Sequence, residues 1–222
     1  MLQIMEALKT TYPGAYAGML LMRSVSNRED HPALESAKKN LEKELQVKYG
    51  NYERSELKEV TPLRQYTAYF KRFKKTYPVL LQLETLVFKG RALPRVSTLV
   101  EAMFMAELKN MLLTAGHDWD SLHEPVRIDV SRGDEQYILL NGEGKKLLPG
   151  DMLMADSQGI ISSVIYGPDQ RTRINPGTKN VLFAVYGVPG IAREAIRHHL
   201  QDIRDNVLLF APQARAELLD VY

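Results

Sequence analysis

The segment from Arg171 to Asn180 carries the densest group of side chains capable of chemistry. It holds three cations, two hydroxyls and two carboxamides, and it leads directly into the apolar run Val181–Tyr186. A turn needs only the central Asn-Pro-Gly. If the chain is extended, Arg171 and Arg173 share one face and form a fork suited to a carboxylate or phosphate. The alternative is pairing with nearby acids such as Asp169, which contributes little at a surface.

A second basic group lies between Arg64 and Tyr77, where cations alternate with aromatic residues. Cations that neutralise phosphates, next to rings that stack on bases, suit nucleic acid. The aromatic residues recur at helical spacing, however, which favours an amphipathic helix with its rings buried and its basic face in solvent. The two interpretations are compatible. We predict that RNA contacts come from four cations of this helix, namely Lys71, Arg72, Lys74 and Lys75.

Other polar clusters favour structure over chemistry. The acids and histidines between His117 and Glu124 lack the His-Glu-x-x-His spacing of a zinc protease, and we expect a solvated loop without a metal or cofactor. His198 and His199 lie on a charged predicted helix, and we expect both at the surface or partly buried. The segment Gly142–Lys146 lacks the glycine spacing of a phosphate-binding loop and predicts a hairpin turn.

Composition limits the class of protein. The chain has 222 residues, of which 25% are charged and 45% hydrophobic, with a net charge of +2 and no cysteine. These values are ordinary for a globular domain, and they exclude disulfides and thiolate chemistry. The charge is too small to indicate nucleic acid by itself. No apolar run reaches the roughly 20 residues of a membrane span. We therefore expect a cytoplasmic protein with no membrane partner.

Hydrophobic periodicity predicts helices first and strands later. After an early strand at Ala15–Met22, helices are expected from Pro32 to Tyr49, from an N-cap at Thr61 to before Pro78, at Val79–Lys89, and from an N-cap at Ser97 to Leu113. Predicted strands follow at 126–130, 136–140, 146–148, 153–156, 160–166 and 180–186, before a helix that begins near Pro189.

We therefore predict an α+β fold, in which a helix-rich N-terminal half packs on a mixed, mostly antiparallel sheet in the C-terminal half. The chain is expected to form a single domain over residues 1–222, with a helical part at about 30–115 and a sheet part at about 116–210.

Several short motifs occur in a familiar order, strongest from Leu93 to Val188. They are Lys89–Pro94, Ser97–Ala102, Gly116–Leu122, Ala155-Asp156, Thr172–Asn175 and Thr178–Phe183. In this order and spacing the chain resembles the tRNA-binding and editing (B-three/B-four) domain of the phenylalanyl-tRNA synthetase beta subunit, over about residues 15–210. It looks closest to freestanding proteins built on that domain.

The resemblance implies binding of tRNA and hydrolysis of tyrosine misattached to tRNA for phenylalanine. The family's editing histidine falls at Asp120, and its editing glutamate at Ala184 in the strand Val181–Ala184, so neither editing residue is present. The departures leave hydrolysis of another aminoacyl ester open, because such a reaction can use the tRNA's own terminal hydroxyl and an oriented water. The pocket would still need donors at the developing oxyanion.

We therefore place a pocket between the Asp120 loop and the Arg171–Asn180 loop. The predicted catalytic residues are Asp120 and Asp169, and the predicted substrate-binding residues are Arg171, Thr172, Arg173 and Asn175. The leading hypothesis is a freestanding tRNA-binding domain that removes misattached amino acids in trans, with tRNA or aminoacyl-tRNA as partner. The alternatives are a binding protein for an amino-acid-like metabolite without RNA activity, and a structural partner of a synthetase.

Overall fold

The computed structural model describes residues 2–222. Its helices are α1 (Glu6–Thr11), α2 (Pro32–Tyr49), α3 (Arg54–Glu59), α4 (Thr61–Arg72), α5 (Pro78–Lys89), α6 (Thr98–Asn110) and α7 (Arg193–Leu208), with a short 3-10 helix at Trp119–Ser121. Its strands are β1 (Leu2–Ile4), β2 (Tyr16–Arg23), β3 (Thr114–Asp118), β4 (Val126–Val130), β5 (Gln136–Ile138), β6 (Gly144–Lys146), β7 (Met152–Asp156), β8 (Gly159–Ser163), β9 (Gly167–Pro168), β10 (Val181–Gly187) and β11 (Arg215–Val221).

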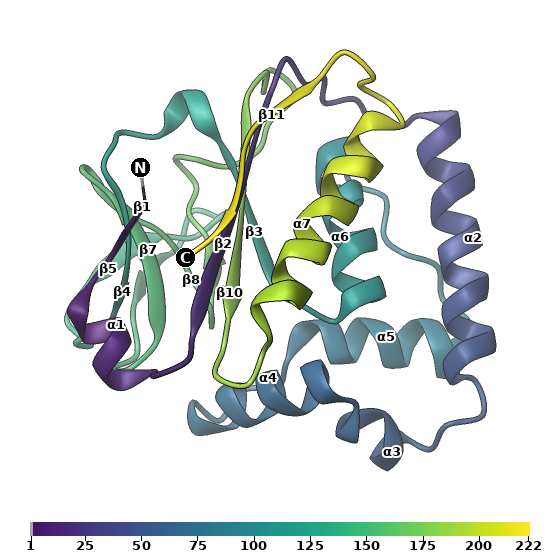
Figure 1. Cartoon of the computed structure of the whole chain (residues 1–222), viewed down its shortest axis with the longest axis horizontal. Helices are drawn as coiled ribbons and strands as arrows, with labels where there is room; N and C mark the ends of the chain where they lie inside the picture. Colours follow the sequence, from purple (N-terminus) through teal and green to yellow (C-terminus); the bar gives the residue numbers. More distant parts are fainter. Residues whose placement is uncertain (1) are drawn as a thin grey trace.

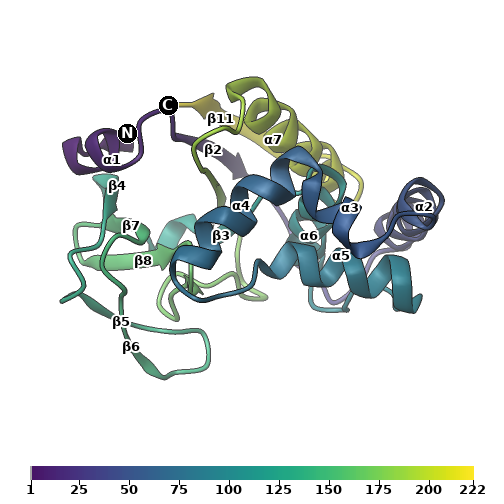
Figure 2. The same cartoon turned by 90° about the horizontal axis from the view of Figure 1, so that it is seen from below.

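These elements form three layers (Figure 1). A four-stranded sheet in the order β11-β2-β10-β3 lies in the middle, with α6 and α7 on one side and a five-stranded sheet, β1-β4-β7-β8-β9, on the other. The pairing of β1 with β4 is parallel, whereas the other strand pairs are antiparallel. Figure 2 shows the β5–β6 hairpin projecting beyond the five-stranded sheet. The predicted α+β class, with mixed and mostly antiparallel strands, is confirmed.

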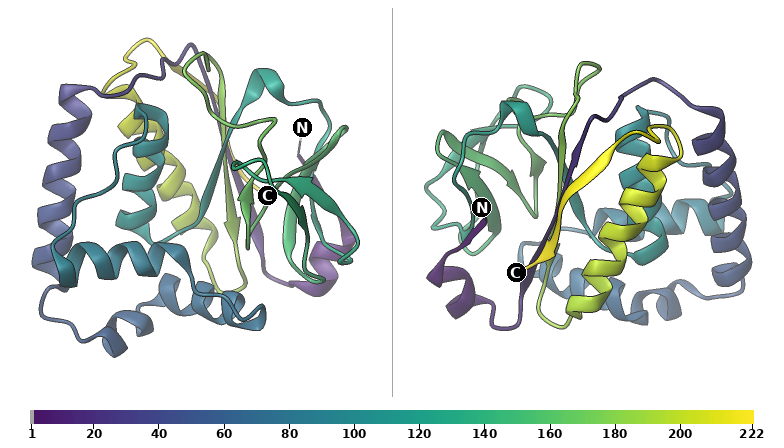
Figure 3. Two further views of the ribbon diagram at one scale, coloured as in Figure 1. Left: turned by 180° about the vertical axis from the view of Figure 1, so that it is seen from behind. Right: turned by 45° about the horizontal axis from the view of Figure 1, so that its top comes forward.

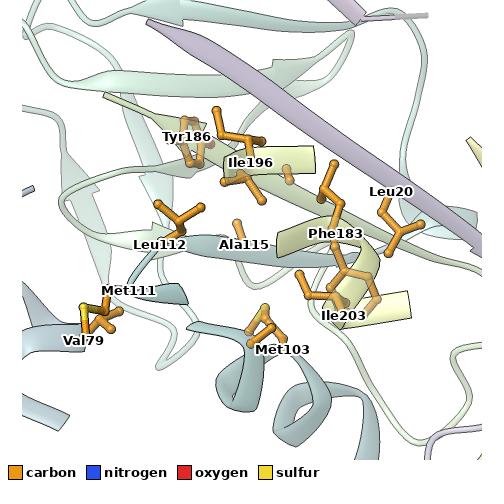
Figure 4. Close-up of a cluster of buried hydrophobic side chains, with 14 of the residues drawn as sticks. Leu20, Val79, Met103, Met111, Leu112, Ala115, Phe183, Tyr186, Ile196 and Ile203 are labelled. Atoms are coloured by element: carbon orange, nitrogen blue, oxygen red, sulfur yellow. The ribbon is translucent and has the colours of Figure 1, made fainter. Parts of the chain in front are cut away.

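The central strand β10 anchors the core. All seven of its residues are buried, because it pairs with β2 and β3 and lies between helices and the second sheet. Figure 4 shows Phe183 and Tyr186 of this strand among side chains from α6 and α7, including Met103 and Ile196. A Cβ on Gly18 or Gly187 would lie 2.4 Å from the Ile196 side chain. Glycine at these two positions therefore lets α7 approach the sheet closely.

Helix α4 buries its aromatic stripe, as the helical spacing predicts. Tyr66, Tyr69 and Phe70 are buried. The Tyr66 ring stacks on Tyr77, with centroids 4.6 Å apart and planes 9° from parallel. The cations at the end of the helix remain exposed. With α5, this helix lies across the end of the α6–α7 layer (Figure 3).

The end of α6 differs from the prediction. We expected the helix to continue to Leu113, but it ends at Asn110 because Met111 adopts a left-handed conformation with φ of 59°. The chain then enters β3, a strand that sequence reasoning did not predict. One expected cap differs, because Thr61 is the first helical residue after an N-cap at Val60. Ser97 is the N-cap of α6 as predicted, although its side chain forms no cap hydrogen bond.

Candidate functional site

The loop between β9 and β10 is held in place by Asp118 at the end of β3. Asp118 Oδ2 accepts hydrogen bonds from Asn175 Nδ2 at 3.0 Å and from Thr178 Oγ1 at 2.8 Å. Asn175 Oδ1 in turn accepts from the backbone N–H of Gly177. The side chain of Asn175, predicted to bind substrate, thus serves the turn as well as lining a cleft.

Arg171 is committed to carboxylates of the protein itself. Its guanidinium lies 2.8 Å from Asp156 and 3.7 Å from Asp169, and it donates to the carbonyl of Ser121. Burial alone would raise the pKa of Asp156, but hydrogen bonds from the His123 and Gln158 backbone and from Arg171 hold it below its usual value. The fork expected with Arg173 does not form, because Arg171 and Thr172 lie in a turn.

Thr172 and Asp169 belong to a buried relay that ends at His117 of β3. Thr172 Oγ1 donates to Asp169 Oδ1, and it lies 2.7 Å from His117 Nδ1. Since the hydroxyl proton is used by Asp169, Oγ1 accepts from Nδ1–H. Burial and the nearby Arg171 lower the pKa of His117 to about 3, so the ring is neutral. Burial raises the pKa of Asp169. The expectation that His117 lies in a solvated loop is wrong.

Arg173 is a cation of this loop that stays available at the clefts; Lys179 is also exposed but lines neither cleft. Within residues 2–222 the Arg173 guanidinium forms no hydrogen bond or ion pair, and the residue is exposed. It lines two clefts at once. The first, here called the polar cleft, has a volume of about 520 Å³ and lies between β5, the β7–β8 turn and the loop residues Asp169–Arg171. The second, the apolar cleft, has about 490 Å³.

The apolar cleft lies between α5, α6 and the β3–β9 region. Most of its lining is hydrophobic, including Val100, Met103 and Phe104 of α6 and Ile174 of the loop. One acid interrupts it: Glu107, only 4% exposed, accepts a hydrogen bond of 2.7 Å from the backbone N–H of Thr114. Burial raises the pKa of Glu107 to about 8, against the opposing effect of the Thr114 N–H. The carboxyl is therefore largely protonated at neutral pH.

Asp120 lies apart from both clefts. Its carboxylate accepts two hydrogen bonds from Asn180 Nδ2, at 2.8 and 2.9 Å, and the residue is exposed. It lines neither cleft, whereas Asp169 lines the polar one. The structure thus brings Asp169, Arg171, Arg173 and Asn175 to one cleft, with Thr172 buried behind them, and leaves Asp120 beyond it. The catalytic roles of Asp120 and Asp169 stay predictions.

The predicted RNA-binding cations, Lys71, Arg72, Lys74 and Lys75, are all exposed. Arg72 lies over the ring of Tyr12, with 5.0 Å from its guanidinium carbon to the ring centre. Lys75 and Lys145 converge on Tyr166, with Nζ atoms 5.8 and 4.6 Å from its ring centre. We call Lys75 and Lys145 the lysine pair. Gly167, the residue after Tyr166, lines the apolar cleft. The lysine pair therefore lies beside that cleft.

The histidines and acids between β3 and β4 form no metal centre in the structure. Across residues 2–222, no group of three or more histidines and acids is placed to hold a metal ion. His198 is exposed, as expected, but His199 is completely buried, so that part of the prediction is wrong. His199 Nε2 lies 2.6 Å from Thr114 Oγ1, which explains its burial. Over the same residues, no helix is long and apolar enough to cross a membrane.

Sequence reasoning missed Glu107 and Lys145 as site residues. Glu107 lies four residues from both Met103 and Met111, so its helical spacing places it on the predicted apolar face, and this local signal was overlooked. Lys145 was assigned to a hairpin turn, but it lies in strand β6 after the turn, paired with Tyr137 of β5. The two consecutive lysines Lys145 and Lys146, directly after Gly144, were the local signal of a basic hairpin.

These features define an α+β domain with two clefts that meet at one arginine and with a lysine pair beside the apolar cleft. The chain belongs to the B3/4 domain family, whose sequence model matches residues 63–205, more than half of the chain. The matched range includes α4, both cleft walls at Glu107 and Arg173, and most of α7.

The chain is also similar to one curated protein in sequence and to one solved structure in fold. The chain is 32% identical over 69 residues to the phenylalanine–tRNA ligase beta subunit of Mycoplasma pneumoniae, a match that covers 31% of this chain and 9% of that protein. The fold is similar to a crystal structure of an N-terminal fragment of the phenylalanyl-tRNA synthetase beta subunit from Pyrococcus horikoshii, with a TM-score of 0.50 and 14% identity over 100% of this chain and 50% of that one. The chain thus spans half or less of either relative.

Proposed function

We propose that this domain binds tRNA and receives an aminoacylated 3′ end in the apolar cleft. The observation that carries the proposal is the lysine pair. Two cations from segments 70 residues apart meet at Tyr166, immediately before the cleft wall at Gly167. Phosphate groups bind such cations without sequence preference. Membership of the B3/4 family, with relatives named as tRNA synthetase subunits, supports RNA as the partner.

The cleft dimensions and chemistry support an aminoacyl group as the part of the tRNA that enters. An apolar side chain would lie among Val100, Met103 and Phe104, and the ester would lie toward Arg173. Ester hydrolysis would join a water oxygen to the acyl carbon and release the ribose oxygen, which takes the second proton. Arg173 is placed to donate to the oxyanion that develops on the acyl oxygen. Of the two predicted catalytic carboxylates, Asp169 lines the polar cleft that Arg173 shares and is the group to test for orienting the water, whereas Asp120 lies apart from both clefts.

Binding is tested with the purified chain and bulk tRNA, by fluorescence anisotropy between 50 and 200 mM salt. We expect affinity to fall steeply with salt. The double substitution Lys75→Ala with Lys145→Ala should weaken binding. It should also reduce the slope of log affinity against log salt by about 1.5, the change expected when two phosphate contacts are lost. The matched control is Lys43→Ala with Lys48→Ala on α2, where Lys48 also lies 5.0 Å from a tyrosine ring centre. Equal effects of the two pairs would contradict this interface.

Deacylation is tested with pooled aminoacyl-tRNAs, by following the loss of each charged amino acid. Arg173→Ala should slow any loss at least tenfold if the guanidinium stabilises the oxyanion. The control is Val47→Ala, a substitution of an exposed residue on α2. If the chain binds no tRNA and deacylates none, the tRNA proposal is wrong.

A second candidate is a binding protein for a free amino-acid-like metabolite. The net charge of +2 and the apolar lining of the cleft favour it. Such a ligand would bind with little dependence on salt and without any RNA. A synthetase partner is a further proposal, which co-purification of the chain with synthetase subunits would test.

A further inference from the structure

We propose that Glu107 is the recognition site for the primary amino group of a ligand whose apolar side chain fills the apolar cleft. The inference rests on the proposed function only for its ligand class, because aminoacyl esters and amino-acid-like metabolites both carry this group. Asp120, one of the two carboxylates predicted for the pocket from sequence, lines neither cleft.

The geometry around Glu107 leaves one carboxyl oxygen for a ligand. Oε1 accepts from Thr114 N–H. Within residues 2–222, Oε2 has no hydrogen bond, and Glu107 has no ion pair. The other acid at the clefts, Asp169, is already used, since Oδ1 accepts twice from Thr172 and Oδ2 faces Arg171. Glu107 is therefore the acid whose hydrogen-bonding capacity is unfilled.

The surroundings of Glu107 contain no competing charge. Tyr66 of α4 and Tyr77 face it, and burial raises the pKa of each phenol, so both stay neutral. His199 of α7, beyond Thr114, is neutral because burial lowers its pKa to about 4. The free cation of the cleft, Arg173, lies beside His117, three residues along β3 from Thr114 and hence about 10 Å away. The cleft thus has an acid at one end and a cation at the other.

The protonation states also match an amine. An α-amino group has a pKa near 7.7–8.0, and Glu107 has a pKa of about 8. The complex then needs one proton, shared between carboxyl and amine, so it forms without leaving a buried charge unpaired. Below pH 8 the free Glu107 carboxyl and the free amine each carry a proton, two in all. Above pH 8 neither of them does. Affinity should therefore be highest near pH 8 and should fall about tenfold per pH unit well away from it on either side.

The probes are the amides of leucine, methionine and phenylalanine, each compared with its N-acetyl form, which cannot be an ammonium. Binding is followed by NMR chemical shifts of the whole chain without RNA. We expect each free amine to bind at least tenfold more tightly than its acetylated form near pH 8. Glu107→Gln keeps the Thr114 hydrogen bond and the side-chain volume, and it should reduce the preference to below about twofold.

Several results would overturn the inference. These are equal binding of amine and acetylated forms, an amine preference that survives Glu107→Gln, or no binding by any of the six probes. The affinity of the unmodified chain for the amides, measured against pH, tests the inference without a variant. An affinity that does not change with pH would contradict a proton shared between Glu107 and the amine. Amine-selective binding without a tRNA shift would leave this site intact and remove the tRNA proposal, whereas tRNA binding without amine selectivity would do the reverse.

Discussion

The polar and apolar clefts share Arg173 but differ in how their other charged groups are used. In the polar cleft, Arg171 is paired with Asp156 and Asp169, and Asp169 is also bonded to Thr172. In the apolar cleft, Glu107 has a single backbone donor. Charges that face each other stabilise the fold, whereas a group left without a counterpart is open to a ligand. The Arg171–Asn180 loop therefore mainly stabilises the fold. The apolar cleft contains the acid, Glu107, whose hydrogen-bonding capacity is unfilled.

The largest expected effect separates the two arginines. Arg171→Ala would leave Asp156, whose side chain is fully buried, without its cation, and should lower the free energy of unfolding by about 2–3 kcal/mol. Arg173→Ala should change it by less than about 0.5 kcal/mol, since no contact is lost. Urea denaturation of both variants measures the difference. Equal losses would show that Arg173 also has a structural partner.

The relay gives the next effect. Thr172→Val removes the hydroxyl that joins Asp169 to His117, and it should cost about 2 kcal/mol because two buried polar groups lose a partner. Thr85→Val on α5 is the control, where the hydroxyl bonds only to the helix carbonyl of Leu81. We expect about 0.5 kcal/mol or less there. A small loss at Thr172 would mean that water replaces the hydroxyl.

Filling the apolar cleft should affect ligands more than stability. Val100→Trp, at a partly buried position in the cleft wall, should weaken binding of the amino-acid amides at least tenfold, or about 1.4 kcal/mol. Binding of uncharged tRNA through the lysine pair should change little. Calorimetry with the amides and anisotropy with tRNA measure the two effects separately. Parallel losses of both would place the tRNA body in the cleft.

The last effect is a change in pH dependence, which is measured as a slope of stability against pH and not as a loss at one pH. Glu107 holds a proton in the folded state up to a pKa of about 8, whereas the unfolded chain releases it near 4.5. Folding stability from this group is present below pH 4.5 and is lost as pH rises to 8, by at most about 1.4 kcal/mol per unit. Glu107→Gln should flatten this decline in thermal unfolding, and Glu44→Gln, an exposed control on α2, should not.

Two buried histidines change folding stability with pH in the opposite direction, and they set the lowest pH at which the effect of Glu107 can be measured. The pKa values of His117 and His199 are lowered to about 3 and 4, below the usual 6.5. Their contribution is therefore present above pH 6.5 and is lost as pH falls toward 4. Both variants keep these histidines, so the difference between them reports on Glu107.

Local patterns predicted the elements whose burial they themselves encode. The apolar run of β10, the aromatic stripe of α4 and the end of α5 at Lys89 are all found as expected. In contrast, β3 reads Thr-Ala-Gly-His-Asp, a sequence with little hydrophobicity. Its burial comes from β10 and the loop that cover it, and no short window contains that information.

The site was less predictable because its contacts join distant segments. The partner of Arg171 is Asp156 in another strand, and His199 is buried because it meets Thr114, 85 residues earlier. Lys75 and Lys145 are likewise brought together only by the fold. The sequence could predict which residue types were present in the loop, but which of them remained unpaired depended on the tertiary structure.

The position of Arg173 between two clefts makes the clefts thermodynamically dependent on each other. One guanidinium cannot fully neutralise an anionic group in the polar cleft and another in the apolar cleft at the same time. A ligand that engages it from one side would therefore weaken an anionic ligand on the other side, and the penalty must be equal in both directions. Through the single side chain of Arg173, anionic ligands in the two clefts would thus bind with negative cooperativity.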